Sequence, residues 1–172
     1  MQSSRLVPYL AARRYVSPRG LARPLTPAEA GTRRLAYGLK VPTREAIRVA
    51  AAELARLIPP RAFLVPIPSS DGTVSVNRRL CLAIARRTCG LYAAALGRRA
   101  PVESSCVRAK AGLHRLSPRQ HQMIRVRELP AGARPVFLVD NVVTSGNTLR
   151  AARAALGGRG IGLVFADASA SP

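Results

Sequence analysis

Residues 136–158, VFLVDNVVTSGNTLRAARAALGG, carry the strongest fold signal in this chain of 172 residues. Four apolar residues lead into Asp140 and Asn141, a small polar loop follows, and apolar residues then recur at helical spacing. This order predicts a buried strand, a tight loop and a helix that ends at a glycine pair. Because ligands of open α/β sheets bind beyond the carboxyl ends of the strands, function is expected at this loop.

Further strands and helices alternate along the rest of the chain. Residues 43–60 predict a helix with a capping threonine and a double-proline stop, and residues 74–90 predict a helix closed by Gly90. The predicted strands are residues 62–68, 101–108, 135–140 and 161–167. Continuously apolar strands that alternate with helices imply a parallel sheet covered on both faces. The predicted fold class is therefore α/β, a Rossmann-like parallel sheet flanked by helices.

The N-terminal part of the chain differs in composition from the rest. Four prolines and scattered arginines predict that residues 1–32 form an irregular basic arm, packed on the domain or mobile. Residues 33–172 then form one α/β domain, which is an ordinary domain size. Any hood over a bound acceptor is expected to come from residues 1–60.

A formal net charge of +20 is the strongest global feature. Nearly all of it comes from arginine, since Lys40 and Lys110 are the two lysines. The planar guanidinium suits phosphate recognition, and such a charge attracts both nucleotides and nucleic acids. A compositional bias of the source proteome explains the same charge, and the sequence does not separate these explanations.

The three cysteines point to a reducing compartment. Cys81, Cys89 and Cys106 are odd in number and contain no C-x-x-C pair, so a cytoplasmic protein without a disulfide framework is expected. Cys81 and Cys89 are expected to be buried on a helix. Together with His114 and His121, the cysteines do not match zinc-ligand spacing. No apolar run approaches the length needed to cross a bilayer.

The loop after residue 143 has the features of an anion site. Backbone N–H groups of Thr144, Ser145, Gly146 and Asn147 could converge there, aided by the start of the following helix. The hydroxyl of Thr148 adds a donor. The loop is not a Walker motif, because no lysine follows the glycine, and the dinucleotide fingerprint G-x-G-x-x-G is absent.

Residues 136–148 resemble the phosphoribosyl pyrophosphate (PRPP) motif of type I phosphoribosyltransferases. In that family an apolar strand ends in two acids, followed by two small apolar residues and a Thr/Ser-Thr/Ser-Gly-x-Thr loop. Asn141 departs from this pattern, since it stands where the second acid is expected. The segment LVPIPSS, Asn77 in the next helix and the later basic segment are similar to the competence protein ComF branch. The likeness covers roughly residues 33–167.

The resemblance implies the type I phosphoribosyltransferase fold and a Mg²⁺-dependent enzyme. Such an enzyme would transfer phosphoribose from PRPP to a nitrogen acceptor such as a nucleobase and release pyrophosphate. Asp140 and Asn141 would be the catalytic residues, facing the ribose hydroxyls, with no metal ligand directly assigned. The residues expected to hold the 5′-phosphate are Thr144, Ser145, Gly146, Asn147 and Thr148. Because Asn141 keeps the hydrogen-bonding shape but lacks the charge, slower turnover is expected.

The resemblance also implies a pyrophosphate site with two parts. One is the loop after the first strand, and the other is the basic segment 108–127, which corresponds to the mobile flap of the family. The candidate contacts are Ser69, Ser70, Gly72, Arg108, Lys110 and Arg115. Asp71 does not fit, because a carboxylate repels pyrophosphate unless Mg²⁺ lies between them. An ordinary polar turn and a solvated basic loop are the alternatives.

A second function class stays open. The charge and Asn141 are also compatible with a catalytically weakened protein of this fold that binds nucleic acid or acts in regulation or DNA uptake. Against this stand the scarce aromatic residues, four Tyr, three Phe and no Trp, because single-stranded nucleic acid is usually bound by stacking. The acceptor and its general base are not identified, with Asp140, His114 and His121 as options. The resemblance further implies a homodimer.

Overall fold

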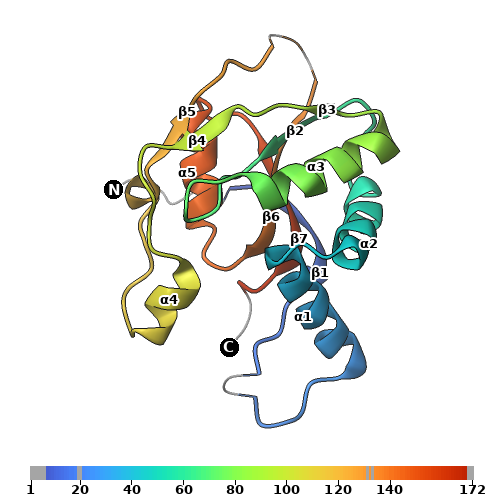
Figure 1. The fold of residues 1–172 in the computed structure, drawn as a ribbon, viewed down its shortest axis with the longest axis vertical. Coiled ribbons are helices and arrows are strands. Elements are labelled where there is room, and N and C mark those ends of the chain that lie inside the picture. The colour runs from blue at the N-terminus through green and yellow to red at the C-terminus, as the bar shows by residue number, and fades with distance from the viewer. Residues whose placement is uncertain (1–6, 19–20, 131, 133, 170–172) are drawn as a thin grey trace.

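A five-stranded parallel sheet forms the centre of the protein (Figure 1). The computed structural model describes residues 7–18, 21–130, 132 and 134–169, without the side chains of Ser105, Cys106 and Lys110. In the order of the sheet, the strands are β1 (Tyr9–Arg14), β7 (Ile161–Asp167), β6 (Val136–Val143), β2 (Phe63–Pro66) and β3 (Leu91–Tyr92). All four neighbouring pairs run parallel. The predicted α/β class, with a parallel sheet flanked by helices, is confirmed.

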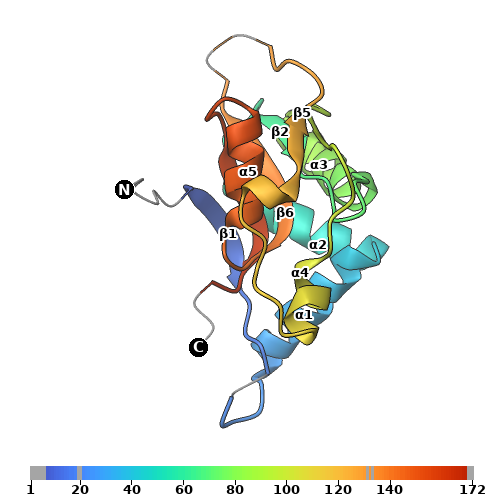
Figure 2. The same cartoon turned by 90° about the vertical axis from the view of Figure 1, so that its left-hand side faces the viewer.

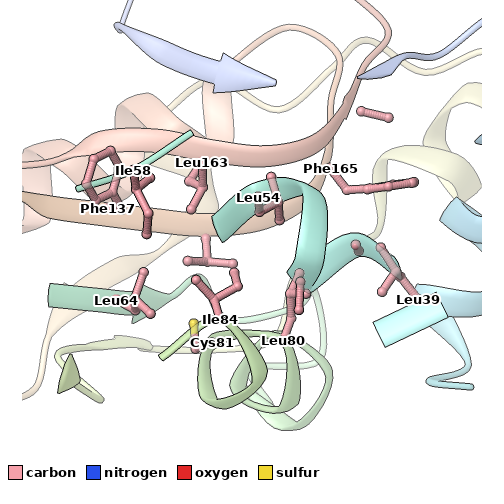
Figure 3. Close-up of a cluster of buried hydrophobic side chains, with 14 of the residues drawn as sticks. Leu39, Leu54, Ile58, Leu64, Leu80, Cys81, Ile84, Phe137, Leu163 and Phe165 are labelled. Atoms are coloured by element: carbon pink, nitrogen blue, oxygen red, sulfur yellow. The ribbon is translucent and has the colours of Figure 1, made fainter. Parts of the chain in front are cut away.

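Helices cover both faces of this sheet, as the side view shows (Figure 2). The helices on one face are α1 (Pro27–Lys40), α2 (Arg44–Ala55) and α3 (Ser75–Thr88), and α5 (Asn147–Ala155) lies on the other. Successive residues of a strand point to opposite faces of the sheet, so they pack into two different hydrophobic cores. Phe137 and Leu163 join the core under α1–α3 (Figure 3), whereas Leu138 packs with Leu149 of α5. Burial on both faces explains why these strands are apolar throughout.

The segment between β3 and β6 forms a smaller layer. Its elements are β4 (Leu96–Arg98), α4 (Ser105–Lys110), the 3₁₀ turn η1 (Arg119–His121) and β5 (Met123–Arg125), and β4 pairs antiparallel with β5. The strand predicted at residues 101–108 is wrong. The hydroxyl of Ser104 accepts a hydrogen bond from the N–H of Val107 at 3.2 Å and starts α4 instead. Serine at this position favours a helix start over a strand.

The N-terminal segment is part of the sheet. The predicted irregular arm is wrong for Tyr9–Arg14, because these residues form edge strand β1 beside β7. Arg13 of β1 donates to Glu53 of α2 at 2.8 Å and lies over the ring of Phe165, 5.5 Å from its centroid. The division expected after residue 32 falls inside α1. A short strand with two arginines lacks the alternation of apolar and polar residues that predicts a strand. It is formed by pairing with β7, which lies far along the chain, and this pairing cannot be read from the local sequence.

Of the two glycine stops predicted for helices, one lies where it was expected and the other is shifted by one residue. Gly157 and Gly158 follow α5 with positive φ, as expected for a glycine stop. At the end of α3 the left-handed residue is Cys89 (φ 51°), one residue before the predicted Gly90. A Cβ at Gly90 would lie 3.1 Å from the carbonyl oxygen of Ala62, so the close packing there favours glycine. Cys81 is buried as expected, but Cys89 is exposed.

Membrane-spanning helices are not found in the described part of the chain: no helix there has the length and apolar character needed to cross a bilayer.

Candidate functional site

A cleft of about 870 Å³ opens at the carboxyl ends of β2 and β6. Its walls come from the loops that follow these two strands, from the end of α1, and from parts of the segment between β4 and η1. Residues of α1 and α4 line the cleft, and these two helices lie at the same end of the molecule (Figure 1). The topology therefore brings the two loops singled out in the sequence to one site.

The loop after β6 presents a helix start whose N-cap residue, Gly146, has no side chain to cap it, and the N–H of Asn147 donates to the Ser145 hydroxyl at 3.4 Å. Thr144, Ser145, Gly146 and Thr148, four of the five residues predicted to bind phosphate, line the cleft. Gly146 has φ 70° and directly precedes α5, and no atom lies within 4 Å of where its Cβ would be. The left-handed backbone, and not lack of space, therefore favours glycine here. First-turn N–H groups without a cap can bind an anion from the cleft.

Asn147, the fifth of these residues, uses its side chain differently. Its Nδ2 donates to the carbonyl oxygen of Leu116 at 2.6 Å, and its Oδ1 accepts from Arg150. Arg150 also donates to the carbonyl oxygen of Ser145 at 3.0 Å. The Asn147 side chain thus connects the loop to the basic segment, while its backbone remains at the helix start.

Asp140 lies near the end of β6 and lines the cleft. Its Oδ1 accepts from the N–H of Asn141 at 2.8 Å and from Nδ2 of Asn77 at 3.4 Å. Burial raises the pKa of Asp140, and these two hydrogen bonds and the charge of Arg98 act in the opposite direction. One oxygen of the carboxylate is therefore held by two amides, and the charge of Arg98 acts on the same group.

Two amide oxygens beside Asp140 are buried without a partner among the described residues. They are Oδ1 of Asn141 and Oδ1 of Asn77, and both residues line the cleft. Asn77 is 5% exposed and is anchored by its Nδ2, which donates to the carbonyl oxygen of Ile67 at 2.8 Å. Buried polar atoms are almost always paired, so these two oxygens are candidates for contact with a ligand.

The loop after β2 is closed by Asp71. Its Oδ1 accepts from the Ser69 hydroxyl at 2.8 Å and from the backbone N–H of Thr73 at 2.9 Å. These bonds, led by the one from the Thr73 backbone, lower the pKa of Asp71. Gly72 supplies the turn with φ 86°, and Ser69 and Ser70 line the cleft. The Asp71 carboxylate therefore has a local role, because its Oδ1 is bound within its own turn.

The three basic candidates in the flap-like segment have different surroundings. Arg115 is exposed and lines the cleft. Arg108 donates to Glu103 at 2.9 Å and to the carbonyl oxygen of His114 at 2.8 Å, so its guanidinium is engaged within the segment. The side chain of Lys110 lies outside the described residues. Arg115 is thus the flap candidate that the fold brings to the cleft.

Arg98 is the main site residue that the sequence analysis missed. Its Nε donates to the carbonyl oxygen of Ser69 at 2.7 Å, its Nη2 to that of Pro68 at 3.2 Å, and its Nη1 to that of His121. Burial lowers the pKa of Arg98, and the charges of Asp140 and Asp71 oppose this shift. One guanidinium therefore holds the loop after β2 against η1. Among so many arginines, no local pattern distinguishes this one.

The two histidines differ in burial. His121 is 5% exposed, lines the cleft, and has an Nδ1 without a hydrogen-bond partner among the described residues. Burial and the charge of Arg98 lower the pKa of His121 to about 4, so its imidazole is neutral at physiological pH. His114 is exposed and does not line the cleft. Of the two, only His121 is placed to meet a ligand.

The end of α1 forms a cleft wall, within the residues 1–60 from which any hood was expected, although the helix itself was not predicted. Tyr37 and Lys40 line it, and Lys40 Nζ lies 5.6 Å from the centroid of the Tyr37 ring. Thr26 and Glu29 form a capping box at the other end of this helix. That motif could have revealed α1, because Thr-x-x-Glu is a recognised helix start.

The described residues contain no group of three or more His, Cys, Asp or Glu that could hold a metal ion alone. Asp140 and the unpartnered oxygens of Asn77 and Asn141 are oxygen donors of the kind Mg²⁺ prefers. Mg²⁺ commonly binds through one or two protein oxygens together with substrate phosphates. The donor set therefore fits a cation that arrives with a phosphorylated ligand.

The comparisons with known proteins do not assign the chain. No family model, curated protein or solved structure matches it. The geometry of the cleft is therefore what supports a function for the chain.

Proposed function

We propose that the chain is a phosphoribosyltransferase-like protein of the type I fold that binds PRPP and transfers its phosphoribosyl group to a nitrogen acceptor. One observation carries the proposal: an uncapped helix start, a strand-end carboxylate and a second glycine turn border a single cleft. A ligand with a phosphate at one end, a sugar in the middle and a second anionic group matches this order of sites.

Each part of PRPP has a counterpart in the cleft. The 5′-phosphate would accept hydrogen bonds from the loop around Gly146 and from the start of α5. The ribose would lie against Asp140 and Asn141. The pyrophosphate would meet Ser70 of the turn after β2 and Arg115, which supplies a cation, whereas the N–H of Ser69 already donates to the carbonyl oxygen of Thr73 at 2.8 Å.

The reaction breaks the bond between the anomeric carbon and a pyrophosphate oxygen, and pyrophosphate leaves with the bonding electrons. A bond forms between that carbon and the acceptor nitrogen, which loses its proton to a base. Positive charge develops on the ribose ring during this exchange, and the Asp140 carboxylate stabilises it. Asn141 orients a hydroxyl without adding charge, so a slow enzyme is expected.

Mg²⁺ fits the same site as a partner of PRPP. Asp140 and Asn141 would hold it together with the ligand oxygens. When bound, Mg²⁺ neutralises charge on the departing pyrophosphate.

Release of pyrophosphate from PRPP tests the enzymatic claim. We expect slow release by the wild type with at least one of adenine, hypoxanthine and uracil, and a rise of about tenfold or more in Asn141→Asp. Asp140→Asn should lose the activity. Asp167→Asn is the matched control, because it removes the carboxylate at the end of neighbouring strand β7, outside the cleft. Absence of release in both the wild type and Asn141→Asp would contradict the proposal.

The net charge of +20 supports a second candidate, a nucleic-acid-binding protein that retains a phosphate-binding cleft. Binding driven by charge alone weakens steeply with salt and does not depend on sequence. A dedicated nucleic-acid function predicts that discrimination between sequences persists at physiological salt. Titration of two labelled oligonucleotides of equal length and different sequence, at rising salt, separates these outcomes.

A further inference from the structure

We propose that Asn77 is a specificity-determining residue that accepts a hydrogen bond from the vicinal hydroxyls of a ribose, so that the cleft distinguishes ribose from 2-deoxyribose. The inference rests on the proposed function, because it assigns the sugar of the ligand to one end of the cleft. It adds a residue from α3 to a site otherwise made by the end of β6.

The orientation of the Asn77 amide follows from its neighbours. Nδ2 donates to the carbonyl oxygen of Ile67 at 2.8 Å and to Oδ1 of Asp140 at 3.4 Å. The reversed amide would place Oδ1 against two acceptor oxygens, which is unfavourable. Oδ1 is therefore the free atom, and it is buried without a partner among the described residues, on a side chain that is 5% exposed.

The surroundings of this oxygen select the chemistry of its partner. Asp140 and the unpartnered Oδ1 of Asn141 add further acceptors in the same cleft, so the ligand must supply several closely spaced donors. Arg98 already supplies a positive charge that acts on Asp140. Mg²⁺ is assigned to Asp140 and Asn141 in the proposed function, so a neutral group with O–H donors suits the oxygen of Asn77. Two adjacent sugar hydroxyls provide two such donors.

Leaving one of these oxygens unpaired in the complex weakens binding. A sugar without its 2-hydroxyl offers one donor where the site has three acceptors. We therefore expect ribose 5-phosphate to bind about fivefold to tenfold more tightly than 2-deoxyribose 5-phosphate, which is the size of one hydrogen bond.

Calorimetric titration of the full chain with both sugar phosphates, with and without Mg²⁺, tests the inference. In Asn77→Ser we expect the preference for ribose 5-phosphate to fall to about twofold or less, because the affinity for ribose 5-phosphate falls by more than the affinity for 2-deoxyribose 5-phosphate. Asn147→Ser is the matched control. Its amide contacts Leu116 and Arg150 beside the phosphate loop, so both sugars should be affected equally.

The outcomes separate the two claims. Equal affinity of the wild type for both sugars overturns the inference without any variant, even if Asn77→Ser fails to fold. An equal loss for both sugars in Asn77→Ser, or a loss seen only with Mg²⁺, also overturns it, because Asn77 would then act on the fold or on a cation. Absence of binding by either sugar phosphate and by PRPP would instead contradict the proposed function.

Discussion

Replacement of Arg98 by methionine should destabilise the protein by separating two walls of the cleft. The guanidinium donates to the carbonyl oxygens of Ser69, Pro68 and His121, and no other described side chain bonds these three carbonyls. A lost hydrogen bond costs about 1 kcal/mol, so three cost about 3 kcal/mol. Removing a partly buried charge recovers some desolvation energy, which reduces the expected loss to about 2 kcal/mol. Methionine keeps the apolar packing of the stem.

Urea unfolding followed by far-UV circular dichroism measures this loss, and the midpoint of thermal unfolding should fall by about 6 °C in a chain of this length. Arg99→Met is the matched control, because Arg99 is the adjacent residue and its side chain is exposed. An exposed substitution usually changes stability by less than about 0.5 kcal/mol. If Arg98→Met and Arg99→Met unfold with the same free energy, the role assigned to Arg98 is refuted.

Two further predictions concern a buried histidine and a crowded glycine. Burial lowers the pKa of His121 to about 4, so the unfolded chain binds more protons between that value and its ordinary pKa, and stability should decrease as pH falls through this window. From pH 7 to 5 the wild type should lose about 2 kcal/mol more than His121→Gln in urea unfolding, and equal losses would contradict the assignment. A Cβ at Gly162 would lie 2.7 Å from Cβ of Tyr9 and 2.8 Å from Cδ1 of Leu149, so Gly162→Ala should cost about 1–3 kcal/mol. The control Gly31→Ala, in an open part of α1, should stabilise by about 0.5–1 kcal/mol, and a neutral Gly162→Ala would show that the strands shift without cost.

The parts of the fold that could be predicted from the sequence are those with long local patterns. β6, α5 and β7 follow from continuous apolar runs, helical spacing and a glycine pair. β1 could not be predicted, because its pairing with β7 joins residues more than 150 positions apart. The strand expected at residues 101–108 failed because Ser104 caps a short helix there.

The residues of the candidate site also fall into those that the sequence predicts and those that it does not. The loop at residues 144–148 and Asp140 could be predicted, since their residues are adjacent in the chain and carry a pattern. The partners of Asn147 and Arg98 could not, because both side chains bond to backbone carbonyls of distant segments. From the sequence alone Asp71 is an obstacle to an anion, and only the hydrogen bonds of its turn explain its presence.

The central claim is that the cleft binds PRPP at the loop after β6, beside Asp140. Calorimetric titration of PRPP into the wild type and Asp140→Ala, with and without Mg²⁺, tests it most directly. We expect binding by the wild type that requires Mg²⁺ and weakens in the variant. Absence of PRPP binding by the wild type under both conditions would contradict the claim.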